Sequence, residues 1–170
     1  VPDLVAAAQR GGKRPVVIRA PAPRRGTGET KEFMALALLV QRWDEIAPWL
    51  VEGLFSEDVH LRAFRVLGVS AGHLEAAISS SDPEARDVLE RAAVVDVDEI
   101  DVDTEARLLL DAAVRRELAR RTRVEDPDQI REDAEARRGL EQLSAPDVDS
   151  GLAGRLLAWI DRRTAVGGTE

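Results

Sequence analysis

The sequence predicts an all-α protein: a helical bundle of five to six helices followed by a C-terminal helical hairpin, with a basic N-terminal linker. Apolar residues recur at intervals of three and four through most of the chain, which is the period of an amphipathic helix. Capping residues and prolines divide this pattern into segments. Alternation of β-branched residues is confined to residues 15–19 and 94–102, so we expect almost no sheet.

The charge changes sign along the chain. Residues 1–25 carry six of the 24 basic side chains and one of the 32 acidic ones, so this head has a net charge of +5 and the rest −13. Prolines and glycines interrupt residues 13–28, which favours an extended linker after a short helix over residues 2–9. We therefore divide the chain into residues 1–28 (the end of a preceding domain and the linker), 29–124 (the bundle) and 125–170 (the hairpin and a frayed tail).

The bundle is expected to open with a helix over residues 29–43. Phe33, Leu36 and Val40 share one face of this helix, and its continuous apolar girth predicts a central position in the core. A second, short helix is expected over residues 44–53, because acidic residues at its start suit the positive end of a helix dipole.

Local signals predict where the next helices begin and end. Pro48 falls near the first turn of the second helix, where proline is tolerated. Ser56 is a good N-cap for a third helix over residues 57–67, which should end at Gly68. A fourth helix is expected over residues 70–79.

The second half of the chain continues this pattern. The string Ser81-Asp82-Pro83-Glu84 predicts the start of a fifth helix, because proline at the first helical position loses no donor. An acidic loop over residues 95–103 leads to the longest helix, over residues 104–124. A highly charged helix follows from residue 126, with Ile130, Ala134 and Ala136 as a thin apolar stripe, and the last helix ends at about Arg163.

Few residues in this chain have the chemistry of an active site. There is no cysteine, so disulfides and thiolate metal sites are excluded. His60 and His73 lie on different predicted helices, and we expect both to be surface or boundary residues. The acidic loop lacks the glycine and the terminal glutamate of an EF-hand. We predict no catalytic, cofactor-binding or metal-binding residue here, and we do not expect this segment to be an enzyme itself.

Charge and hydropathy restrict the partners. The negative bundle would repel a nucleic-acid backbone, so we do not expect it to bind DNA or RNA, although the basic linker could touch phosphate weakly. The longest apolar run, residues 34–40, is too short to span a membrane, so we expect a cytoplasmic protein without a membrane partner.

The last helix suggests a protein partner. Leu152, Leu156, Trp159 and Ile160 share one face of it, and its neighbour in the hairpin is the thin, charged helix from residue 126. Either the hairpin closes on itself and hides this face, or part of the face is left for another protein. Tryptophan would then be the natural anchor, because it often carries interface energy.

Three segments at the start of the bundle indicate a family. They are the helix over residues 32–39, the string VQRWDEI over residues 40–46, and the string GLFS at 53–56, which leads into HLR at 60–62. This order resembles the opening of the C-terminal helicase-binding region of bacterial replicative DNA primase. The helix over residues 1–10 is similar to the tail of the primase polymerase domain, and the long helix with its charged hairpin matches the family's plan.

The resemblance implies that this segment docks the primase on the N-terminal domain of the replicative DNA helicase, for RNA primer synthesis in DNA replication. The hairpin would be the main contact, with Leu152, Leu156 and Trp159 as anchors and Arg155, Arg162 and Arg163 as rim charges. The zinc module and the magnesium-dependent polymerase site of the parent primase would lie upstream, and this segment would hold no cofactor.

Three alternatives stay open at this point. The N-terminal domain of the replicative helicase has the same kind of bundle and a similar opening. A free-standing helical interaction or regulatory bundle would show the same helix pattern. A small helical enzyme that uses His60 or His73 is the third reading.

Overall fold

A computed structural model of the chain describes residues 30–120, 126–145 and 150–167. These residues form eight α-helices and two 3-10 turns without a strand, which confirms the predicted all-α fold. The predicted helix over residues 2–9 and the basic linker lie outside the described residues. The elements are α1 (Lys31–Gln41), α2 (Trp43–Ile46), η1 (Ala47–Trp49), η2 (Glu52–Leu54), α3 (Asp58–Val69), α4 (Leu74–Ser80), α5 (Pro83–Val94), α6 (Val102–Ala119), α7 (Pro127–Leu143) and α8 (Ser150–Gly167).

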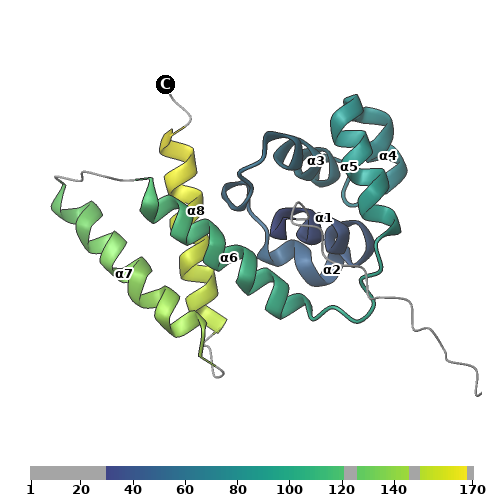
Figure 1. Cartoon of the computed structure of the whole chain (residues 1–170). Coiled ribbons are helices and arrows are strands. Elements are labelled where there is room, and N and C mark those ends of the chain that lie inside the picture. Colours follow the sequence, from purple (N-terminus) through teal and green to yellow (C-terminus); the bar gives the residue numbers. More distant parts are fainter. Residues whose placement is uncertain (1–29, 121–125, 146–149, 168–170) are drawn as a thin grey trace, which may run out of the picture.

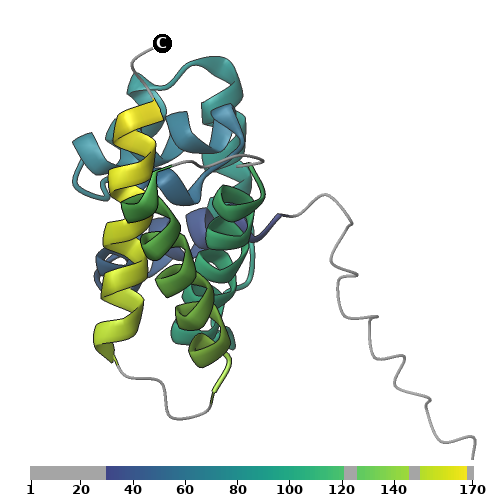
Figure 2. The ribbon, with the colours of Figure 1, turned by 90° about the vertical axis from the view of Figure 1, so that its left-hand side faces the viewer.

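Helix α1 is the centre of the bundle. It packs against α2, α3, α5 and α6, and every residue from Glu32 to Leu39 is buried. Helix α6 lies between this bundle and the α7–α8 hairpin (Figure 1). Figure 2 shows α6, α7 and α8 running side by side, and each of the three packs against the other two. The hairpin therefore shares its apolar core with the bundle.

The two ends of α1 are held by different hydrogen bonds. The Thr30 hydroxyl caps its start by accepting from the Phe33 N–H at 3.3 Å. At its end, the Gln41 side-chain amide donates to the carbonyls of Ala92 (2.9 Å) and Val95 (2.7 Å). Together with Arg42, which donates to the Ile100 carbonyl at 2.7 Å, Gln41 fastens the loop between α5 and α6 to α1.

The prediction of one continuous helix over residues 44–53 is wrong. Helix α2 ends at Ile46, and two separate 3-10 turns follow, joined by extended residues at Leu50 and Val51. Pro48 is too far along the segment to be a first-turn residue, and there it removes a donor and obstructs the preceding turn. The chain therefore changes direction here and brings η2 against α8.

The third and fourth helices differ from the prediction at their boundaries. Glu57, not Ser56, is the N-cap of α3, because the Ser56 hydroxyl donates to the distant carboxylate of Glu32. Helix α3 passes through Gly68, and the chain turns at Ala71 and Gly72, which both have positive φ angles (48° and 79°). Helix α4 therefore starts later than predicted.

Helices α5 and α6 start close to their predicted positions. The Asp82 carboxylate caps α5 by accepting from the N–H groups of Glu84 and Ala85, both at 3.0 Å, which confirms the Pro83 start. Helix α6 begins at Val102, two residues before the predicted start. Its predicted last residues fall partly in 121–125, outside the described residues.

Candidate partner-binding site

The face that α7 presents to the rest of the protein shares only Ala136 with the predicted stripe of Ile130, Ala134 and Ala136. Its buried residues are Asp133, Ala136, Gly139, Leu140 and Leu143, whereas Ile130 is 52 % exposed. The helix is rotated so that its small residues face α8. The apolar pattern missed this rotation, because a glycine and an ion-paired aspartate on the buried face do not register as part of an apolar stripe.

Close packing at Gly139 brings the two helices of the hairpin, α7 and α8, into contact. A Cβ atom at this position would lie 3.0 Å from Leu156 Cδ2 and 3.3 Å from Leu152 Cδ1, so the absence of a side chain lets α8 approach. Leu152, Leu156 and Trp159 are 6 %, 3 % and 5 % exposed. The hairpin thus closes on itself, and the three predicted anchors are buried beneath its surface. Their role in binding a partner stays a prediction.

Ile160 and Arg163 also make contacts in the interior of the structure. Ile160 is fully buried and faces η2, where its Cγ2 occupies the space beside Gly53. Arg163 forms an ion pair with Asp133 of α7, and both side chains are nearly buried. The Arg163 guanidinium also lies over the Trp159 ring, 4.9 Å from its centroid. Arg163, predicted as a rim charge, therefore joins the two helices of the hairpin.

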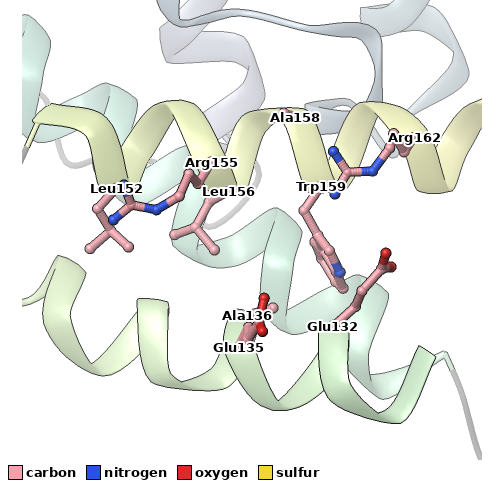
Figure 3. A pocket seen from close by; sticks show the side chains of 9 residues that line it. All are labelled: Glu132, Glu135, Ala136, Leu152, Arg155, Leu156, Ala158, Trp159 and Arg162. Atoms are coloured by element: carbon pink, nitrogen blue, oxygen red, sulfur yellow. The ribbon is translucent and has the colours of Figure 1, made fainter. Parts of the chain in front are cut away.

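A groove of about 240 Å³ runs between α7 and α8 on the face of the hairpin (Figure 3). We call it the hairpin groove. Arg155 and Arg162 lie on its α8 side and are exposed, and Glu132 and Glu135 lie on its α7 side. Its lining residues are Glu132, Glu135, Ala136, Leu152, Arg155, Leu156, Ala158, Trp159 and Arg162. Five of the six residues predicted for partner binding thus line one groove.

Trp159 has an unsatisfied polar atom in this groove. Its ring projects from α8 toward α7 (Figure 3), and its Nε1 is buried without a hydrogen-bond partner among the described residues. A buried donor without an acceptor costs free energy, so native structures seldom leave one unpaired.

Sequence reasoning did not identify the groove residues of α7 or Ala158 of α8. Glu132, Glu135 and Ala158 were not among the predicted site residues, and they line the groove because of how α7 and α8 are rotated. A sequence signal was present: Ala136 and Gly139 are small residues three apart on α7, which is the spacing of neighbours on one helix face.

A second polar arrangement lies inside the bundle and was not predicted. The buried Glu32 carboxylate accepts from the N–H groups of Ser56 (2.8 Å) and Glu57 (3.1 Å) and from the Ser56 hydroxyl. His60 Nδ1 lies 3.1 Å from it, and an Arg116 nitrogen lies 3.6 Å from it. We call these five residues the Glu32 cluster. His60 is 7 % exposed, so the expectation of a surface or boundary histidine is wrong for it, whereas His73 is exposed.

The Glu32 cluster keeps a buried carboxylate ionised. Burial by itself raises the pKa of Glu32, but hydrogen bonds from His60, Ser56 and Glu57 outweigh it and lower the pKa from 4.5 to about 2. The Ser56 hydroxyl donates to Glu32, and this hydrogen bond ties the segment before α3 to α1. Arg116 also donates to the Gly53 carbonyl at 2.8 Å, which links α6 to the same segment.

Within residues 30–120, 126–145 and 150–167, no group of three or more histidine, cysteine, aspartate or glutamate residues is arranged to hold a metal ion. Among the described helices, none combines the length and hydropathy that a membrane crossing requires. No family model matches the chain, and no curated protein or solved structure matches it either.

Proposed function

We propose that this chain is the helicase-binding C-terminal domain of a bacterial DNA primase, which docks the primase on the replicative DNA helicase during RNA primer synthesis. The supporting observation is the closed α7–α8 hairpin, whose groove gathers Leu152, Arg155, Leu156, Trp159 and Arg162 on one face. A bundle followed by such a hairpin is the plan expected from the sequence resemblance. In this proposal the domain brings the primase to the helicase. The catalytic domains of the parent primase lie upstream.

The resemblance segments have specific structural roles that fit this proposal. Gln41 and Arg42 of the VQRWDEI string hold the loop before α6, and α6 carries the hairpin. Ser56 of the GLFS string and His60 of the HLR string both contact Glu32. These strings therefore build the frame on which the hairpin is presented.

The direct test is binding of the purified chain to the N-terminal domain of the cognate replicative helicase, measured by calorimetry. We expect saturable binding and a change in the helicase's unwinding rate when the chain is added. No measurable binding at about 100 µM would contradict the proposal. Deleting residues 145–170 is a poor test by itself, because Ile160 and Leu156 belong to the shared core and their loss would disturb α6.

Gene context separates the proposal from its alternatives. A polymerase-type domain encoded immediately before Val1 supports the primase assignment. An ATPase domain encoded after Glu170 would favour the helicase alternative, and neither neighbour would favour a free-standing interaction bundle.

A further inference from the structure

The walls of the hairpin groove carry opposite charges. Two basic side chains, Arg155 and Arg162, follow the α8 side, and two acidic ones, Glu132 and Glu135, follow the α7 side. The floor between them is apolar, formed by Ala136, Leu152 and Leu156. A ligand that matches this groove has an apolar ridge with an acidic flank and a basic flank.

An amphipathic helix has that shape. We propose that the hairpin groove holds one helix of the partner protein, with its acidic flank along α8 and its basic flank along α7. This inference rests on the proposed function, in which the partner is the N-terminal domain of the helicase. An amphipathic helix that lays its apolar face in an apolar groove is a recurring way of recognising a partner segment.

The spacing of the charges sets the spacing on the partner. Arg155 and Arg162 are seven residues apart, which is two turns or about 10 Å along α8. Glu132 and Glu135 are one turn apart on α7. A partner helix aligned with the groove therefore presents acidic residues two turns apart on one flank and a basic residue on the other.

The order of the charges also fixes the direction of the partner helix. Reversing a helix while its apolar ridge stays on the floor exchanges its two flanks. The acidic flank would then meet Glu132 and Glu135, and like charges in contact strongly disfavour such a complex. The groove thus accepts a given partner helix in one direction.

The test measures the affinity of the full chain for the helicase N-terminal domain. The variant Arg155→Glu/Arg162→Glu should bind at least about tenfold more weakly, because it sets acid against acid. The matched control, Arg137→Glu/Arg138→Glu, changes the net charge equally at exposed residues of α7 outside the groove and should bind like the wild type.

A second substitution tests whether filling the groove with a side chain prevents binding. Ala158 is exposed and lines the groove, so Ala158→Trp should obstruct it while the thermal midpoint stays close to that of the wild type. Circular dichroism of every variant confirms that the helices remain.

The outcomes separate this inference from the proposed function. If the wild type binds and Arg155→Glu/Arg162→Glu binds equally well, or the control weakens instead, the groove assignment is wrong and the proposed function stands. If the wild type fails to bind, both are wrong. If sedimentation shows self-association that the same groove variants abolish, the occupant is a second copy of this chain, and the assignment to a partner helix is overturned.

Discussion

The backbone of Gly53 lies directly against the side chain of Ile160. A Cβ atom on Gly53 would be 2.4 Å from Ile160 Cγ2 and 2.9 Å from Thr164 Cγ2, closer than side chains can pack. This contact joins η2, in the bundle, to α8, in the hairpin. The position of the hairpin on the bundle therefore depends on the absence of a side chain at residue 53.

Replacing Gly53 with alanine should destabilise this junction. The added methyl group must displace α8 or strain η2, so Gly53→Ala should lower the free energy of unfolding by about 1–3 kcal/mol. The control is Gly154→Ala in α8, where nothing lies within 4 Å of the new Cβ atom and helix propensity should add about 0.5–1 kcal/mol. Urea denaturation measures both, and equal stability of the two variants would contradict the packing described here.

The Glu32 cluster should make the protein sensitive to acid. The pKa of Glu32 is about 2 in the folded protein and about 4.5 when the chain is unfolded, so protonation favours the unfolded state. The stabilisation is complete above pH 4.5 and is lost as the pH falls toward 2, and a shift of this size corresponds to about 3 kcal/mol.

Urea midpoints measured between pH 2 and pH 6 test this linkage. The variant Glu32→Gln should be less stable than the wild type at pH 6 and should show a flatter dependence on pH below 4.5. Glu90→Gln, at an exposed position of α5, is the control and should keep the wild-type dependence. An unchanged slope in Glu32→Gln would show that other carboxylates cause the acid sensitivity.

The ion pair between Asp133 and Arg163 should contribute more to the free energy of unfolding than the exposed ion pairs do. Asp133→Ala leaves the nearly buried Arg163 charge without its carboxylate, and we expect a loss of about 3 kcal/mol in unfolding free energy. Asp87→Ala, which breaks the exposed pair with Arg91, should cost a small fraction of that.

The double variant Asp133→Leu/Arg163→Met should regain most of the stability lost in Asp133→Ala, because removing both charges leaves neither one buried alone. Thermal unfolding of the three variants provides the comparison. A double variant as unstable as Asp133→Ala would indicate that packing around Trp159 dominates and the ion pair does not.

Gln41 should control the order of the loop between α5 and α6. Gln41→Ala removes the hydrogen bonds to the Ala92 and Val95 carbonyls, so amide hydrogen exchange should become faster over residues 92–100. Exchange in α3 is the internal control, because the two Gln41 hydrogen bonds go to the loop between α5 and α6, and the exchange rate in α3 should not change. Equally faster exchange in both segments would mean that the substitution lowers global stability.

Local sequence signals determined the helices themselves. The period of the apolar residues predicted the all-α fold, and short-range caps such as Asp82 before Pro83 set helix starts correctly. These features depend on residues within one or two turns of each other, so they can be read along the chain. The central position of α1 also followed from its own composition, because a helix that is apolar all round must be enclosed.

The tertiary structure alone decided which side chains meet. Ser56 was predicted as a cap, but it donates to Glu32, 24 residues away. A buried carboxylate without donors costs more free energy than a helix start without a side-chain cap. The rotation of α7 follows from Gly139 meeting Leu156 and from Asp133 meeting Arg163. Such pairings join residues that are far apart in sequence, so helical periodicity places each residue on a face but does not specify what that face contacts.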